Sequence, residues 1–213
     1  MTNLSLPGRR GPRAGRPWLN DLLAWALIGL VLLAWVLSWR GTLSGAWPHV
    51  LETQSGTFSY VLLALTATLG PLIGTRFLPS WLNAGMKTGW HGVLAGFALV
   101  VGTLHGLFAT VGHDALSVPA VLVPGLAPHR TWTMAAGTLA LWGMGLVYVT
   151  WALRGRIGVR AARALHLLAY PAFIAATLHA TWLGHGHLDP LYVLGSVAVG
   201  GALAARLLTL ARR

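Results

Sequence analysis

The stretch of sequence that decides the fold runs from 91 to 111 and reads HGVLAGFALVVGTLHGLFATV. It contains no Asp, Glu, Lys or Arg, and its 21 residues, at about 1.5 Å each, match the roughly 30 Å of hydrocarbon that a transmembrane helix has to cross. Two histidines, His91 and His105, interrupt this apolar run 14 residues apart. Because ionisable side chains are costly inside a membrane and usually functional, the stretch predicts a transmembrane helix with two functional histidines.

A second stretch, from 160 to 182, repeats this pattern and reads RAARALHLLAYPAFIAATLHATW. His166 and His179 lie 13 residues apart, a rise of about 20 Å against about 21 Å on the first stretch. One further apolar span separates the two stretches, so both helices run in the same direction. We therefore expect His91 at the depth of His166 and His105 at the depth of His179. Two neutral imidazoles at one level are what a six-coordinate haem iron requires.

On a straight helix, the two histidines of the second stretch would point in different directions around the helix axis. At about 100° per residue, 14 residues return to within about 40° of the starting face, whereas 13 residues miss it by about 140°. The helix therefore has to bend, twist or present its two histidines at different azimuths. Pro171 lies between His166 and His179. An interior proline removes a backbone hydrogen bond and kinks a helix, so Pro171 predicts a bend as the remedy.

The composition of the whole chain fits a membrane protein. Of its 213 residues, 55% are hydrophobic and 9% charged, and the mean hydropathy is positive. The absence of cysteine excludes disulfides, thiolate-ligated iron–sulfur clusters and covalently attached c-type haem, so any haem is held noncovalently. Six apolar segments predict helices at about 19–40, 56–76, 90–112, 131–153, 161–183 and 188–208.

We thus predict an all-α polytopic membrane protein, a six-transmembrane-helix bundle with haem between the third and fifth helices. A basic cytoplasmic tail at 1–18 precedes this bundle, which occupies 19–210. We expect the first apolar run to be an uncleaved anchor and not an export signal, because it is long for one. Lipid is then the main partner of the chain.

The distribution of Lys and Arg predicts the orientation. The net charge of +11 suggests nucleic acid only in a soluble protein; here the basic residues sit between apolar runs, so no nucleic-acid partner is expected. Only Arg40 and Arg130 fall on one side of the predicted bundle. The other thirteen fall on the opposite, cytoplasmic side: Arg9, Arg10, Arg13, Arg16, Arg76, Lys87, Arg154, Arg156, Arg160, Arg163, Arg206, Arg212 and Arg213. We predict a bacterial inner (plasma) membrane protein with cytoplasmic N- and C-termini.

The remaining histidines and several glycines carry weaker signals. Five histidines are predicted as loop residues on the outer side, and the pair in His185-Gly-His187 is a weak metal-binding signal: His49, His113, His129, His185 and His187. Four glycines flank the histidines of the first stretch and serve either close haem contact or helix packing: Gly92, Gly96, Gly102 and Gly106.

At Gly102-Thr103-Leu104-His105 and at 160–170 followed by His179, the sequence resembles the ferric reductase-like transmembrane domain superfamily. This superfamily includes ferric reductases, the membrane part of NADPH oxidases, and the YedZ/MsrQ-type haem subunits of bacterial methionine sulfoxide reductase systems. The resemblance covers the second to sixth helices. It implies one or two b haems with His91, His105, His166 and His179 as axial iron ligands, and electron transfer from a cytoplasmic or membrane donor to an outer-face acceptor.

Two departures bear on partners. Full-length ferric reductases and NADPH oxidases add a flavin and nicotinamide domain, whereas this chain has no dinucleotide-binding fingerprint. We therefore expect an oxidoreductase component that receives electrons from FMN or another flavin, a quinone or a partner reductase. YedZ/MsrQ-type subunits typically lack the first histidine of the third helix, which His91 supplies here. That subgroup, with its periplasmic reductase partner, is the alternative interpretation.

A different class of function is a proton-coupled membrane transporter that uses the intramembrane histidines as a relay. Such a relay favours Asp or Glu partners inside the membrane, and the sequence has no acidic residue in the middle of a predicted span. A purely structural membrane subunit leaves the four histidines unexplained.

Overall fold

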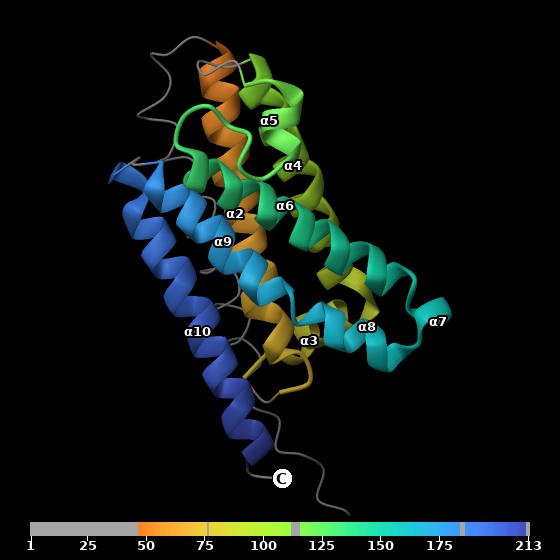
Figure 1. The fold of residues 1–213 in the computed structure, drawn as a ribbon. Helices are drawn as coiled ribbons and strands as arrows, with labels where there is room; N and C mark the ends of the chain where they lie inside the picture. Colours follow the sequence, from red (N-terminus) through yellow and green to blue (C-terminus); the bar gives the residue numbers. More distant parts are fainter. Residues whose placement is uncertain (1–46, 76, 112–115, 184–185, 212–213) are drawn as a thin grey trace, which may run out of the picture.

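The described residues of the computed structural model are 47–75, 77–111, 116–183 and 186–211, and within them the chain is all-helical, without a strand (Figure 1). The predicted basic tail at 1–18 and the predicted helix at 19–40 lie outside these residues. The helical fold class is confirmed for the part of the chain that is described.

Five helical segments of the described chain are long and apolar enough to cross a membrane. They agree with the second to sixth predicted helices, and the prediction of those five is confirmed. Four are single helices and the fifth is formed by two consecutive ones: α2 (Trp47–Leu72), α4 (His91–Val111), α6 (Thr131–Ala152), α8 (Val159–His166) with α9 (Ala169–Trp182), and α10 (Asp189–Ala211).

Hydropathy predicts that this helix begins near 56, but α2 begins at Trp47. The added turns carry polar residues, among them Glu52 and Gln54, which lower the hydropathy and hide the helix start. Gln54 is buried at 4% exposure, so these polar residues serve the interior of the bundle. The apolar window of α2 is 50% buried, against 11–28% for the other spans. Helix α2 is therefore the central helix.

The packing around α2 sets the arrangement of the other spans. Helix α2 contacts α4, α9 and α10, and α6 contacts α9, α8 and α4. The ring of Tyr60 on α2 stacks on Phe173 of α9 at 5.8 Å and meets Tyr192 of α10 edge-on at 4.9 Å. The Tyr60 hydroxyl also lies 3.2 Å from Thr177 Oγ1 and donates to the carbonyl of Tyr192 at 3.3 Å. This cluster joins three spans at the middle of the bundle.

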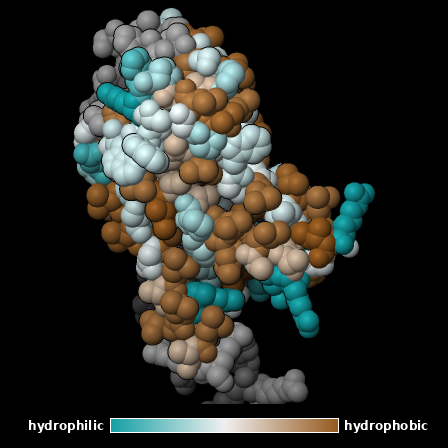
Figure 2. Space-filling model, in the orientation of Figure 1, coloured by the Kyte–Doolittle hydropathy of each residue, from teal (hydrophilic) through white to brown (hydrophobic). Residues whose placement is uncertain are grey.

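The outward faces of the spans are apolar. Phe97, Val100 and Leu107 on α4 are 54–59% exposed, and Figure 2 shows apolar side chains over much of the visible face. A soluble monomer rarely exposes apolar surface on this scale. The surface is suited to contact with lipid, as expected for a multi-pass membrane protein.

Two interruptions of helical geometry stand next to predicted site residues. Helix α3 (Ser80–Gly85) continues into the π-helical turn η1 (Met86–Trp90), where Gly89 has φ 128° and kinks the chain just before His91. Between α8 and α9 the helix is broken at Leu167 and Leu168, four and three residues before Pro171. Proline lacks an N–H and clashes with the carbonyl four residues earlier, so the bend predicted from Pro171 is confirmed.

The remaining elements are short connections between the spans. They are α5 (Val118–Leu122), α7 (Arg154–Ile157) and the 3-10 turn η2 (Gly186–Leu188). Different short elements lie at the two ends of the bundle: in Figure 1, α5 lies at one end, and α3, α7 and α8 lie toward the other.

Candidate functional site

The structure brings the four predicted histidines together as two pairs between α4 and the α8–α9 span. The ring centroids of His91 and His166 are 6.1 Å apart, and those of His105 and His179 are 6.0 Å apart. We call the first the break pair, because His91 follows the kink at Gly89 and His166 ends α8. We call the second the cavity pair. The pairing predicted from depth is confirmed as a geometrical arrangement.

The separation within each pair has a direct chemical meaning. Two imidazoles that bind one metal ion from opposite sides, each with its nitrogen about 2.0 Å from the metal, have ring centroids roughly 6.3 Å apart. Both pairs lie close to this value, at 6.0 and 6.1 Å. A haem iron needs only two such protein ligands, because the macrocycle supplies the other four. The described residues contain no group of three or more His, Cys, Asp or Glu side chains that could hold a bare metal ion.

Backbone carbonyls hold the rings of the cavity pair. His105 Nδ1 lies 2.9 Å from the carbonyl oxygen of Glu52 on α2, and His179 Nδ1 lies 2.8 Å from the carbonyl oxygen of Thr133 on α6. A carbonyl only accepts, so each Nδ1 carries the proton and donates it. The lone pair is then on Nε2, the form in which histidine binds a metal. Sequence reasoning could not find these partners, because a backbone carbonyl leaves no side-chain signature.

Glycines on the neighbouring helices make room for the same two rings. A Cβ on Gly56 of α2 would lie 2.9 Å from both Cε1 and Nδ1 of His105. A Cβ on Gly137 of α6 would lie 2.7 Å from Nδ1 of His179. Side-chain carbons do not approach so closely, so both positions require glycine. The helices that carry neither histidine thereby determine where the two rings sit.

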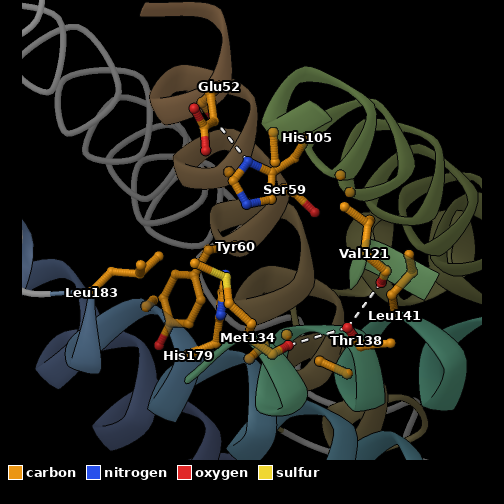
Figure 3. Close-up of a pocket in the computed structure, with 18 of the residues that line it drawn as sticks. Glu52, Ser59, Tyr60, His105, Val121, Met134, Thr138, Leu141, His179 and Leu183 are labelled. Atoms are coloured by element: carbon orange, nitrogen blue, oxygen red, sulfur yellow. Dashed lines mark hydrogen bonds between the residues drawn. The ribbon is translucent and has the colours of Figure 1, made fainter. Parts of the chain in front are cut away.

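A cavity of about 560 Å³ is lined by both members of the cavity pair. This volume is within the range of about 300–1,000 Å³ found for small-molecule and cofactor sites. Figure 3 shows His105 with Glu52 on one side of the cavity and His179 with Met134 and Tyr60 on the other. The wall is largely apolar, as a flat macrocycle requires.

One part of the cavity wall is cationic. Exposed His129 and Arg130 line it, and the Arg130 guanidinium donates to the carbonyl of Leu183 at 3.1 Å. Arg130 is the residue directly before α6, and its backbone has the left-handed conformation, with φ 49° and ψ 41°. A cationic group here is suited to a carboxylate, such as the propionate of a haem. In the sequence, Arg130 contributed only to the charge count, although its place directly before a predicted span was visible.

The break pair has different surroundings. A Cβ on Gly70 of α2 would lie 3.1 Å from Cε1 of His91, and the ring centroid of Trp151 lies 5.2 Å from that of His166. The Nδ1 atoms of His91 and His166 are buried, and no residue in the described ranges provides a hydrogen-bond partner for them. Gly56 and Gly70 are 14 residues apart, as are His91 and His105. This matched spacing is visible in the sequence and was the signal that could have identified Gly56 and Gly70 on α2.

The weaker predictions, four glycines and five histidines, have different outcomes. A Cβ on Gly96, Gly102 or Gly106 would meet Tyr148 at 3.3 Å, Ser59 at 2.9 Å or Val121 at 3.1 Å, so these glycines allow close packing, and Gly102 and Gly106 also line the cavity. Gly92 faces open space. His129 lies in a loop, as predicted, whereas His49, predicted in a loop, lies in the first turn of α2 and lines the cavity. His113, His185 and the side chain of His187 lie outside the described residues.

Comparison with known proteins finds no family model, no curated protein and no solved structure that matches this chain. The resemblance to the ferric reductase-like superfamily therefore rests on the motif residues quoted above and on nothing else.

Proposed function

We propose that this protein is a haem b-containing membrane protein that carries electrons across the bilayer from an inner-face donor to an outer-face acceptor. The observation that carries the proposal is the recurrence of one geometry at two levels. Two spans hold two histidine pairs, each with ring centroids 6.0 to 6.1 Å apart, close to the separation at which two imidazoles bind one iron.

The protein's own groups have the chemistry that axial ligation needs. The carbonyls of Glu52 and Thr133 keep the proton of His105 and His179 on Nδ1, which leaves Nε2 as the ligand atom. Gly56 and Gly137 allow the rings to lie against α2 and α6. Haem would supply a one-electron carrier, and with two histidine ligands it has no open iron position for oxygen chemistry.

The depth of the two pairs is suited to transmembrane transfer. His91 and His105 are 14 residues apart on α4, a rise of about 21 Å. One carrier at each level would place one redox centre toward each face of a hydrocarbon layer of about 30 Å. A single carrier at either level would leave most of that thickness uncrossed, so we propose two haems.

The charge distribution supports an orientation. Every described Lys and Arg except Arg130 lies toward the break-pair end: Lys87, Arg154, Arg156, Arg160, Arg163 and Arg206. Because cytoplasmic ends retain positive charge, we propose that the break pair faces the cytoplasm and the cavity pair the outer side. With a sixth span at 19–40, both termini are then cytoplasmic, in a bacterial inner membrane.

We further propose that the chain is a ferric reductase-like electron-transfer component, with a flavin, a quinone or a partner reductase as donor. The alternative, a YedZ/MsrQ-type subunit that serves a periplasmic reductase, differs in its use of His91. The 6.1 Å separation of His91 and His166 favours the two-haem arrangement over that subgroup.

The test is an optical one on purified protein from haem-replete cells. We expect b-type bands in the reduced-minus-oxidised spectrum and close to two haems per chain. His91→Ala and His105→Ala should each remove about one haem, whereas His113→Ala, outside the predicted spans, should remove none. Colourless protein, or unchanged haem content in His105→Ala, would overturn the proposal.

A further inference from the structure

We infer that the two histidine pairs form unequal haem sites: the cavity pair binds haem more tightly and at a more negative midpoint potential than the break pair. This inference rests on the proposed function and concerns what the residues around each pair do to it. Three differences between the two pairs carry it: the first two bear on affinity and on potential, and the third bears on affinity.

The first difference is the hydrogen bonding of Nδ1. Both ligands of the cavity pair donate from Nδ1 to a backbone carbonyl, at 2.9 Å for His105 and 2.8 Å for His179. This donation makes Nε2 more basic, and a more basic ligand stabilises ferric iron more than ferrous iron. Second-sphere partners of this kind change metal affinity by about 10–100-fold. They lower the potential of the centre that they support.

The second difference is that the described residues give the break pair no such partners. The Nδ1 atoms of His91 and His166 are buried, and the described residues offer them no acceptor. Within this part of the chain, nothing keeps their ring protons on Nδ1, and no hydrogen bond adds basicity to Nε2. Both properties weaken ferric ligation and leave the potential higher.

The third difference is preorganisation. The cavity pair lines a space of about 560 Å³, and glycines accommodate both of its rings from behind. Neither His91 nor His166 lines that space. The two rings of the break pair also sit at helix interruptions, next to the Gly89 kink and the Leu167–Leu168 break. A site held by continuous helices requires less rearrangement on binding than one held by their ends.

These differences make a quantitative prediction for the potentials. For a one-electron couple, each tenfold difference in the ratio of ferric to ferrous affinity shifts the potential by 59 mV. Electrons that enter at the break pair would then move to the more negative centre. The transmembrane potential, negative inside, would favour that outward step.

The experiment isolates each site by removing the ligands of the other. His91→Ala/His166→Ala keeps only the cavity pair, and His105→Ala/His179→Ala keeps only the break pair. Haem release is measured by transfer to excess apomyoglobin, and the potential by optical redox titration. We expect release at least tenfold slower from the cavity-pair variant, and a midpoint more negative by about 59 mV for each tenfold difference in the ratio of ferric to ferrous affinity.

The outcomes separate the inference from the function on which it rests. Equal release rates and potentials, or the reverse order, would overturn the inference and leave haem binding intact. Absence of haem from the wild type would overturn the proposed function itself. If the break-pair variant does not fold, the redox titration of His91→Ala decides: it should lose the more positive component of the wild-type curve, and loss of the more negative one would overturn the inference.

Discussion

Gly137 on α6 lies directly behind the ring of His179 on α9: a Cβ at Gly137 would come within 2.7 Å of Nδ1 and 2.8 Å of Cε1. The same ring donates from Nδ1 to the carbonyl of Thr133, four residues earlier on α6. One turn of α6 thus provides both the space for the imidazole and the acceptor that orients it. Helix α6, which packs against α9, therefore determines where the ring of His179, a proposed ligand, lies.

Gly137→Ala should therefore displace His179 and abolish haem binding at the cavity pair. Alanine is favoured over glycine in a helix by about 1 kcal/mol, so a weaker helix cannot be the reason for the loss. We expect about one haem fewer per chain, measured as the pyridine haemochrome. Gly145→Ala on the same helix is the control, because nothing lies within 4 Å of a Cβ there. Equal haem content in the two variants would contradict this account of α6.

The two glycines of α2 should act on different pairs. A Cβ on Gly56 would lie 2.9 Å from His105 and one on Gly70 would lie 3.1 Å from His91. Gly56→Ala should change the more negative component of the redox titration, and Gly70→Ala the more positive one. The Gly70→Ala effect should be the smaller, since a shift of a few tenths of an ångström relieves it. Gly200→Ala on α10, which faces open space, should change neither component, and a change at the opposite pair would refute the assignment.

The depth of the four histidines was predictable because it depends only on sequence spacing and on the alternation of spans. The 13- and 14-residue spacings place the rings at two common levels. In the structure, the two ring centroids at each level are 6.1 Å apart for His91 and His166 and 6.0 Å apart for His105 and His179. The bend at Pro171 was predictable for the same local reason, since a proline in the interior of a helix removes a backbone hydrogen bond and clashes with the carbonyl four residues earlier. These features need no knowledge of which helices are neighbours.

The start of α2 and the surroundings of the rings were not predictable in this way. Glu52 and Gln54 look like loop residues to a hydropathy scale, and they are helical because their side chains and carbonyls serve the bundle interior. The contacts of Gly56 and Gly137 depend on which helix packs against which, and a sequence of apolar spans does not state that. The kink at Gly89 likewise arises from a positive φ, which glycine permits and does not impose.

The two members of the cavity pair should behave as one unit on mutation. A haem iron that loses either axial ligand loses the site, so His105→Ala and His179→Ala should each remove about one haem. The double variant should remove no more than either single one, which is the strong non-additivity expected of residues in direct partnership. His91→Ala with His105→Ala should instead remove both haems. Additive losses within the cavity pair would mean that its members do not share one iron. Haem counts and band amplitudes measure both cases.

Pro171→Ala tests the bend between α8 and α9. Alanine restores the missing N–H and removes the clash with the carbonyl of Leu167, which favours one continuous helix. On a straight helix His166 and His179 would diverge by about 140°, so both rings cannot keep their partners on α4. We expect the variant to lose about one haem without loss of thermal stability in detergent. Pro119→Ala is the control, because Pro119 stands in the first turn of α5, where proline is tolerated. Full haem content in Pro171→Ala would show that the bend is not needed for alignment.

The orientation can be tested with single cysteines, because the chain has none of its own. Leu126, between α5 and α6, is 56% exposed, and Gly155 on α7 has nothing within 4 Å of a Cβ. In the proposed orientation, the arginines flanking Gly155 place it on the cytoplasmic side, because positive charge is retained there. A membrane-impermeant maleimide added to intact spheroplasts should therefore label Leu126→Cys at once and Gly155→Cys only after permeabilisation, with the cysteine-free parent as the blank. The reverse pattern would place the break pair outside. The proposed direction of electron transfer would then be wrong, although haem ligation by the four histidines would be unaffected.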